Sequence, residues 1–281
     1  MRARDQTGDP RSWPRARKRY GQHFLTDPGI LRKIVDAVDA APGDTIVEVG
    51  PGRGSLTAEL LARGVRVVAV EIDRDLAERL SRDHGGDGRL SVIQADVLDV
   101  DLSRAAGGGE YAVAGNLPYY ITTPILFHVL EASRPPKRSV FMVQREVGER
   151  LIAPPGAEEY GALSVNVQAR ANARIAFAVP AGAFHPRPRV ESVVVTIVPR
   201  PDPILEAGDL APYSAFVIAC FGLRRKQIRR VLRTVYDLSA EQSDAAAAQA
   251  GIDPTSRPEI LSPEQFALLW RACGSRTATA S

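Results

Sequence analysis

The segment Asn116-Leu117-Pro118-Tyr119 combines residue types that could activate an aromatic amine. The lone pair of an exocyclic amine on a nucleobase is delocalised into the ring, so the nitrogen is a poor nucleophile. Two acceptors facing its hydrogens, the Asn116 side-chain oxygen and the Leu117 carbonyl oxygen, would draw the nitrogen towards a tetrahedral form. Pro118 would hold these acceptors in place, and Tyr119 offers a ring on which a flipped-out base can stack. Asn and Pro are also common in ordinary turns, so the assignment depends on what lies beside the segment.

A glycine-rich turn, Glu48-Val49-Gly50-Pro51-Gly52-Arg53-Gly54, follows a β-branched run and precedes an amphipathic segment. Such a turn lets a ligand approach a helix N-terminus closely. Its third glycine comes one residue earlier than in a dinucleotide fingerprint, which disfavours a nicotinamide cofactor. Glu71 and Asp96 follow the next two β-branched runs, where a carboxylate can accept hydrogen bonds from ribose hydroxyls. The pattern favours a nucleoside ligand with an amino-acid tail and a sulfonium cation.

A second stiff loop, Phe184-His185-Pro186-Arg187-Pro188-Arg189, alternates prolines with basic residues. Phe184 could close on the base from the face opposite to Tyr119, although a core phenylalanine before an edge strand fits the sequence equally well. Arg187 and Arg189 would then contact phosphates.

Short apolar runs alternate with amphipathic segments over the first two thirds of the chain. Strands are expected at 45–49, 65–70, 90–94, 111–114 and 139–144, and helices at 28–38, 55–63, 73–82 and 124–131, the last capped by Thr123. Such an alternation predicts a mostly parallel sheet covered on both faces. The runs 174–179 and 190–198 have no helix of normal length between them, so they should pair antiparallel at one edge. The predicted class is α/β, a Rossmann-like domain that carries the glycine turn and Asn116 on one rim.

Three regions differ in composition. Residues 1–20 hold seven Arg or Lys and two Asp and predict a flexible basic arm. Residues 21–199 form the α/β domain. The prolines at 199–203 should end regular structure, and 204–281 is expected to be a small all-helical domain.

A basic segment lies in that helical region. Six Arg or Lys and no acid fall between Leu223 and Arg233, while Ile228, Val231, Leu232 and Val235 form a core-facing stripe. Lys226, Arg230 and Arg233 should project on the opposite face. We expect RNA-backbone contacts, which set affinity and register rather than base choice, from the residues Arg224, Arg225, Lys226, Arg229, Arg230 and Arg233.

Overall composition is compatible with these assignments but adds little. The chain has 281 residues, a net charge of +3 and a pI near 9.0. The two cysteines, Cys220 and Cys273, lie in apolar surroundings and predict reduced core residues rather than a disulfide or metal site. The sequence has no apolar run long enough to span a membrane and no metal-ligand spacing among its four histidines. A cytoplasmic protein without a metal is expected.

These motifs together resemble those of the bacterial small-subunit ribosomal RNA adenine N6,N6-dimethyltransferases. The matching blocks are Gly21-Gln22-His23-Phe24-Leu25, Glu48 to Gly52, Glu71-Ile72-Asp73, Asp96, Gly115 to Tyr119, Phe184 with its prolines, and Phe221-Gly222-Leu223-Arg224-Arg225-Lys226. The resemblance implies the class I methyltransferase fold and S-adenosylmethionine as cofactor. It implies that the cofactor pocket is lined by the backbone near His23 and Leu25, and by Gly50, Gly52, Glu71, Asp96 and Asn116. It also implies two adjacent adenosines in a hairpin loop near the 3′ end of 16S rRNA as substrate, within the small subunit, and a role in subunit biogenesis. We expect the chain to be a monomer.

Two alternatives stay open. A related group methylates large-subunit rRNA and confers macrolide resistance; its members tend to have Ile at the position of Leu117 and lack the Arg-Arg-Lys block. The chain could also act mainly by occupying RNA, as an assembly or transcription factor. The intact Asn116–Tyr119 block argues against that as the sole role.

Overall fold

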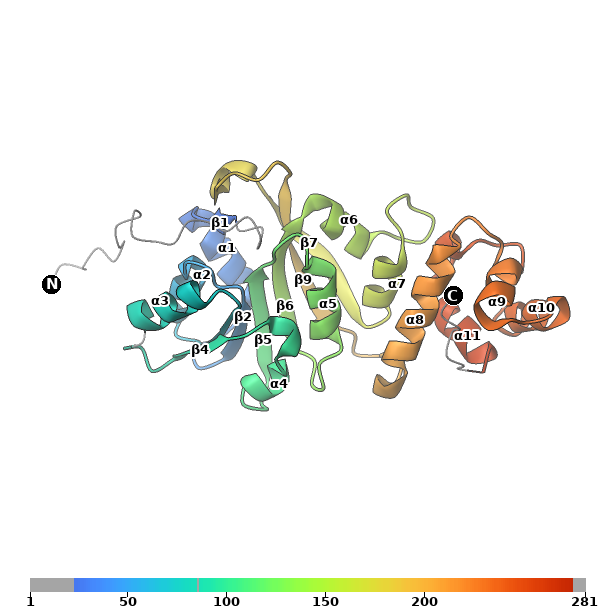
Figure 1. Ribbon diagram of the computed structural model, residues 1–281, viewed down its shortest axis with the longest axis horizontal. Coiled ribbons are helices and arrows are strands. Elements are labelled where there is room, and N and C mark those ends of the chain that lie inside the picture. The colour runs from blue at the N-terminus through green and yellow to red at the C-terminus, as the bar shows by residue number, and fades with distance from the viewer. Residues whose placement is uncertain (1–22, 85, 275–281) are drawn as a thin grey trace.

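The computed structural model describes residues 23–84 and 86–274 (Figure 1). The predicted basic arm at 1–20, and Gly21 and Gln22 of the first matching block, lie outside the described residues.

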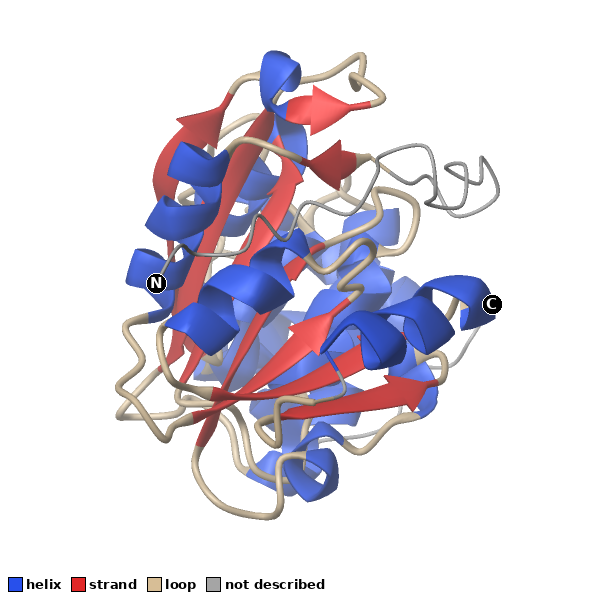
Figure 2. Cartoon of the chain, turned by 90° about the vertical axis from the view of Figure 1, so that its left-hand side faces the viewer, coloured by secondary structure: helices blue, strands red, loops and turns tan. Residues whose placement is uncertain are grey.

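A seven-stranded sheet forms the centre of the molecule. Its order is β4-β3-β2-β5-β6-β9-β7, in which the first five strands are parallel and β9 is antiparallel to both of its neighbours (Figure 2). The mostly parallel sheet and the antiparallel pair at one edge are as predicted. The strands are β2 (Thr45–Val49), β3 (Arg66–Glu71), β4 (Leu90–Gln94), β5 (Tyr111–Asn116), β6 (Arg138–Gln144), β7 (Ala171–Val179) and β9 (Ser192–Pro199).

Helices cover both faces of this sheet. Because successive strand residues point to opposite faces, Ile46 packs with Leu60 and other residues on one side, whereas Val47 packs with Leu126 and other residues on the other. The first layer contains α1 (Pro28–Val38), α2 (Ser55–Ala62) and α3 (Arg74–His84); the second contains α4 (Leu102–Ala105), α5 (Thr122–Leu130), α6 (Arg145–Ile152) and α7 (Ala162–Gln168).

Two helix details differ from the sequence prediction. The predicted cap Thr123 lies inside α5, whose N-cap is Ile121; Thr122 instead donates its hydroxyl to the Pro118 carbonyl oxygen at 3.0 Å. The helices α4, α6 and α7 were not predicted, because each is short, with four, eight and seven residues.

A two-stranded antiparallel ribbon lies apart from the main sheet. It joins β1 (Phe24–Leu25) to β8 (Phe184–His185), with Leu25 opposite Phe184. The ribbon brings the first described residues against the proline-rich loop, although about 160 residues separate them in sequence.

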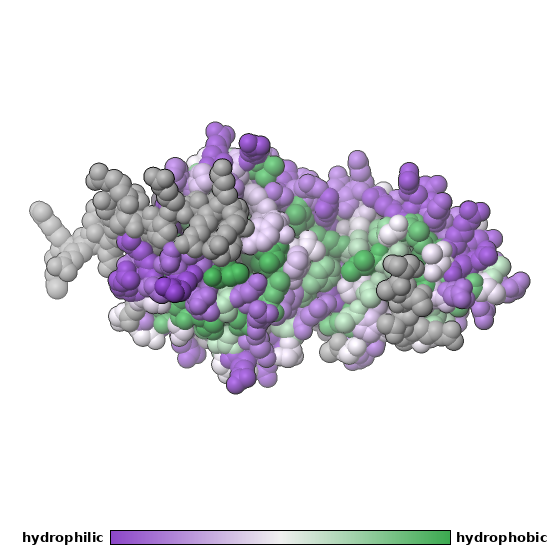
Figure 3. Space-filling model, viewed as in Figure 1, coloured by the Kyte–Doolittle hydropathy of each residue, from purple (hydrophilic) through white to green (hydrophobic). Residues whose placement is uncertain are grey.

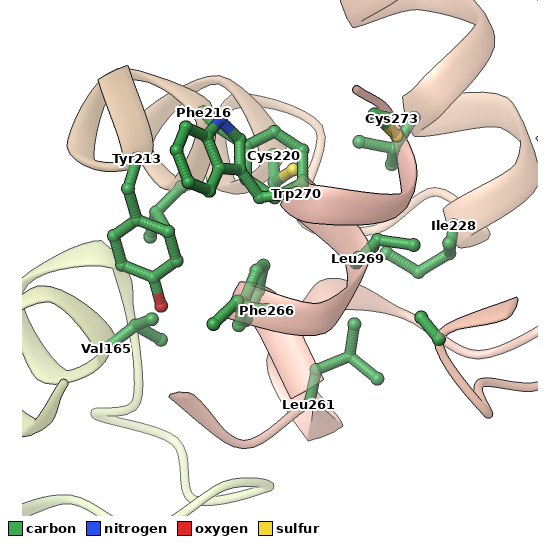
Figure 4. Packing of buried hydrophobic residues seen from close by; sticks show 14 of the residues in the cluster. Val165, Tyr213, Phe216, Cys220, Ile228, Leu261, Phe266, Leu269, Trp270 and Cys273 are labelled. Atoms are coloured by element: carbon green, nitrogen blue, oxygen red, sulfur yellow. The ribbon is translucent and has the colours of Figure 1, made fainter. Parts of the chain in front are cut away.

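The last quarter of the described chain is helical, as predicted. It contains α8 (Leu210–Gly222), α9 (Ile228–Tyr236), α10 (Ala240–Gln249) and α11 (Pro263–Ala272). Their shared core holds Phe216, Phe266 and Trp270, and both cysteines lie buried and free within it, as predicted (Figure 4). Tyr160 and Val165, which precede the prolines at 199–203, belong to the same core. The domain boundary itself stays a prediction.

On the face shown in Figure 3, hydrophilic residues predominate around the edges and hydrophobic residues gather towards the middle. None of the helices within 23–84 and 86–274 has the length and hydropathy required to cross a bilayer.

Candidate functional site

The glycine turn forms the floor of the site. Gly50, Gly52 and Gly54 have positive φ angles of 65°, 57° and 76°, which residues with a side chain rarely adopt. The Gly50 amide donates to the Val70 carbonyl oxygen at 3.0 Å, which joins the end of β2 to the end of β3. The three glycines therefore turn the chain sharply from β2 into α2 beside the carboxyl ends of the strands.

The Glu71 carboxylate links this turn to the end of β3. One oxygen accepts from the Gly52 amide at 3.0 Å and the other from the Asp73 amide at 2.9 Å. The side chain is 4 % exposed, and burial raises the pKa of its carboxyl group. These two backbone donors fix the plane of the carboxylate, which leaves its other lone pairs for hydroxyl groups of a ligand.

Glu48 is a second buried acid at the site. It accepts a 2.6 Å hydrogen bond from the Thr57 hydroxyl, and it is 1 % exposed. Burial raises the pKa of Glu48 from its ordinary value of 4.5 to about 8. The acid is therefore mainly protonated at pH 7 in the protein alone.

Asn116 ends β5 with its side-chain amide fixed. Its Nδ2 donates to the His23 carbonyl oxygen at 2.8 Å. Because a carbonyl oxygen can only accept, the amide nitrogen must face His23, and Oδ1 is turned the other way. The orientation that leaves Oδ1 as an acceptor is thus set by His23, the residue that precedes β1.

The residues after Asn116 form a rigid turn. The Leu117 amide donates to the Met142 carbonyl oxygen at 3.1 Å, and the Ile121 amide to the Pro118 carbonyl oxygen at 3.2 Å. Tyr119, inside this turn, shares a 2.9 Å hydrogen bond with the Ser192 hydroxyl. The predicted preorganisation of this segment therefore has a physical basis in hydrogen bonds to β6, α5 and β9.

His23 connects three parts of the site. Its carbonyl oxygen accepts from Asn116, and its Nδ1 lies 2.8 Å from the Pro186 carbonyl oxygen. Its ring stacks on that of Tyr119, with the centroids 5.8 Å apart. The imidazole thus lies against one face of Tyr119, which leaves the other face for a base. The family resemblance named His23 only for its backbone; the side-chain contacts depend on long-range packing that no local pattern reveals.

The glycine turn, the two buried acids and the Asn116 segment border one cavity at the carboxyl ends of the strands. Every residue predicted to bind the cofactor is among those lining it, and so are Leu117, Pro118 and Tyr119. The predicted cofactor residues are His23, Leu25, Gly50, Gly52, Glu71, Asp96 and Asn116. Asp96 also caps the short helix at 97–99, where it accepts from the Leu98 amide at 3.0 Å.

Phe24 and Arg53 are a pair at this cavity that the sequence analysis did not predict. The Arg53 guanidinium lies over the Phe24 ring, 4.5 Å from its centroid, and a Cβ at Gly52 would approach that ring to 3.1 Å. Both residues line the cavity. Arg53 therefore helps to hold the β1 segment over the glycine turn.

Phe184 does not line the cavity. Its ring is 5 % exposed and packs in the core cluster that contains Leu25. The structure thus corresponds to the core alternative, because pairing of β8 with β1 turns this side chain inward. A stacking role for Phe184 stays a prediction that this geometry does not support.

The predicted RNA-binding residues differ in their surroundings. Arg224 pairs with Glu259 at 2.8 Å and donates to the Glu158 carbonyl oxygen, and Arg229 pairs with Asp244 at 3.4 Å. Their charges are thus partly neutralised within the chain. The other six have exposed side chains: Arg187, Arg189, Arg225, Lys226, Arg230 and Arg233. On α9 the stripe Ile228, Val231, Leu232 and Val235 is buried as predicted, whereas Lys226 precedes the helix.

The sequence of this chain resembles those of known proteins. A family model described as ribosomal RNA adenine dimethylase matches residues 14–272. The protein named ribosomal RNA small subunit methyltransferase A from Methylococcus capsulatus is 44 % identical over 255 residues, covering 91 % of this chain and 96 % of the relative. Its namesake from Bordetella petrii is 45 % identical over 255 residues, covering 89 % and 92 %.

Solved structures share the fold. The crystal structure of the 23S rRNA methyltransferase ErmE superposes with a TM-score of 0.67 at 26 % identity, covering 89 % of this chain and 99 % of that one. That of a dimethyladenosine transferase from Plasmodium falciparum gives a TM-score of 0.73 at 23 % identity, covering 90 % and 98 %.

Proposed function

This chain belongs to the ribosomal RNA adenine dimethylase family, and we propose that it uses S-adenosylmethionine to dimethylate the N6 amines of two adjacent adenosines. The proposed target is the hairpin loop near the 3′ end of 16S rRNA in the small ribosomal subunit. Relatives of 44 % and 45 % identity bear the name of small-subunit methyltransferases, which supports the small subunit as the target.

The cavity provides polar groups that suit the parts of S-adenosylmethionine. The oriented Glu71 carboxylate can accept from both ribose hydroxyls, and the glycine turn admits the amino-acid tail close to the backbone. Glu48 adds a buried acid beside the same cavity, where a positively charged ligand favours its ionised form. The bound cofactor supplies an electrophilic methyl group on a sulfonium leaving group.

Asn116 and Leu117 act on the amine. The Asn116 Oδ1, whose direction is set by His23, and the Leu117 carbonyl oxygen accept the two N6 hydrogens and localise the nitrogen lone pair towards the methyl group. Tyr119 supplies a stacking face for the flipped-out base. No strong base or metal is needed, because the sulfonium is a good leaving group and the extra proton can leave to water. Alignment of amine and methyl is mainly a proximity effect.

The presence of Asn116 and Glu71 in the wall of the same cavity carries this proposal. Purified chain is incubated with methyl-labelled S-adenosylmethionine and small subunits that lack the modification. We expect label in N6,N6-dimethyladenosine near the 3′ end of 16S rRNA. Large subunits are offered in a parallel reaction. Label found only there would favour the alternative function, methylation of large-subunit rRNA, which is the activity named for ErmE.

We further propose that the exposed basic residues bind rRNA, and that the chain acts as a monomer in the cytoplasm without a metal ion. The six exposed side chains lie on two segments, the loop after β8 and the region around α9. Residues placed to meet phosphates in this way position the RNA rather than choose the base.

A further inference from the structure

Tyr120 is an aromatic residue at the site that the proposed reaction does not use. It is 59 % exposed, more than the other large hydrophobic residues with exposed side chains in the described part of the chain. It also lines the cavity that contains Asn116 and Glu71. An aromatic ring presented to water beside a base-binding cavity is a typical platform for an unpaired base.

The backbone holds Tyr120 in a defined place. Tyr119 and Tyr120 occupy the two central positions of the turn closed by the hydrogen bond from the Ile121 amide to the Pro118 carbonyl oxygen. Tyr119 is tied to Ser192 and stacked on His23, so the turn is fixed from both sides. Tyr120 therefore stands one residue from the predicted base-stacking ring.

The substrate of the proposed function places a second base at this position. When one of two adjacent adenosines enters the cavity, its covalently linked neighbour must remain at the entrance. We propose that Tyr120 stacks on this neighbouring base, so that the site recognises a pair of adenosines rather than a single one. Adenine favours such a contact because a purine has a large π-face. This inference rests on the proposed function.

The test combines variants of Tyr120 with a change in the RNA. Small subunits are reconstituted with 16S rRNA that carries either adenosine or uridine beside the target adenosine. Transfer of the first methyl to the target is measured as kcat/KM for wild type, Tyr120→Ala, Tyr120→Leu and Tyr120→Phe, all as full-length chains. The affinity for S-adenosylmethionine is measured separately by calorimetry, and the melting temperature verifies folding.

We expect Tyr120→Ala to lower kcat/KM by about 10-fold, mainly through KM, since loss of a stacked base costs about this much. Tyr120→Leu should behave like Tyr120→Ala, whereas Tyr120→Phe should stay near wild type. Replacement of the neighbouring adenosine by uridine should reduce the kcat/KM of wild type several-fold, but it should not reduce the kcat/KM of Tyr120→Ala any further. The control Ile218→Ala changes a residue of similar exposure, 53 %, that lies on α8 and outside the cavity. Its kcat/KM should equal that of wild type on both substrates.

Three results would overturn the inference. The first is an equal loss of kcat/KM on the uridine substrate for wild type and Tyr120→Ala. The second is a kcat/KM of Tyr120→Leu equal to that of wild type. The third is a Tyr120→Ala variant with a changed affinity for S-adenosylmethionine and an unchanged KM for the subunit. In each case wild type still methylates, so the proposed function stands. A wild-type chain that labels no adenosine at all removes the proposed function and this inference with it.

Discussion

The side-chain amide of Asn116 donates to the backbone carbonyl oxygen of His23 at 2.8 Å, across 93 residues of sequence. The residue assigned to activate the amine is thus oriented by the residue that precedes β1. His23 in turn contacts the proline-rich loop and Tyr119. The target-base side of the cavity is therefore assembled from three distant segments of the chain.

Replacement of Asn116 by alanine should reduce methyl transfer by about 100-fold or more, because it removes a preorganised acceptor for the reacting amine. The affinity for S-adenosylmethionine should change much less. Transfer is measured with unmodified small subunits and affinity by calorimetry. Asn172→Ala, on the exposed edge strand β7, is the matched control. Near-normal turnover of Asn116→Ala would remove this residue from its assigned role.

Substitution of Glu71 by glutamine should weaken S-adenosylmethionine and S-adenosylhomocysteine alike, because the ribose is common to both. The expected increase in Kd is about 10-fold or more, the cost of losing a hydrogen bond to a charged acceptor. Titration calorimetry measures it. Glu78→Gln, in an exposed i,i+4 ion pair on α3, should leave Kd unchanged. A Kd for Glu71→Gln equal to that of wild type would contradict the assignment.

The buried Glu48 predicts a specific pH dependence of stability. Its pKa in the folded state, about 8, lies above its ordinary value of 4.5, so between these values the native chain binds a proton that the unfolded chain has lost. The contribution of Glu48 to the free energy of unfolding should therefore fall as pH rises from about 4.5 to 8, by up to about 1.4 kcal/mol per pH unit, and level off above.

Glu48→Gln should lack this contribution. Because burial also raises the pKa of Glu71, the quantity to use is the difference between the wild-type and variant curves. Urea unfolding at pH 5 to 9 gives both. Wild type should lose stability relative to the variant as pH increases; parallel curves would show that Glu48 ionises normally.

Gly115 is required for close packing of β5 on β2. A Cβ at this position would lie 2.5 Å from the Val49 carbonyl oxygen, so Gly115→Ala must push the strands apart and displace Asn116. We expect a loss of about 1–3 kcal/mol in the free energy of unfolding together with reduced methyl transfer. Gly182→Ala, where a Cβ meets no atom within 4 Å, should have little effect. Equal stability of the two variants would contradict the packing argument.

Removal of two exposed charges on α9, by Arg230→Gln with Arg233→Gln, should weaken binding of small subunits and make it less dependent on salt. Each lost phosphate contact lowers the slope of log K against log salt by about 0.7 to 0.9. Affinity is measured at several salt concentrations. A control with the same change in charge is Arg66→Gln with Arg104→Gln, near the amino ends of the strands. If both pairs reduce the slope equally, α9 is not the specific contact.

The sheet and the cofactor side of the cavity could be predicted from sequence because their signals are local. Glu71 ends β3 and Asp96 lies two residues after β4. Gly50, Gly52 and Gly54 mark the turn, and each of them has a positive φ angle. The side-chain contacts of His23 could not be predicted, since they depend on pairing of β1 with β8. The same ribbon buries Phe184, and the partners of Arg224 come from two other segments. Local patterns identify residue types but not such long-range partners.

A crystal structure of the chain with S-adenosylhomocysteine and adenosine would test the central claim most directly. We expect Glu71 to form hydrogen bonds with both ribose hydroxyls of the cofactor product, and Asn116 Oδ1 to lie within about 3.2 Å of the adenosine N6. Binding of the cofactor product away from Glu71, or of adenosine with N6 pointing away from Asn116, would contradict it.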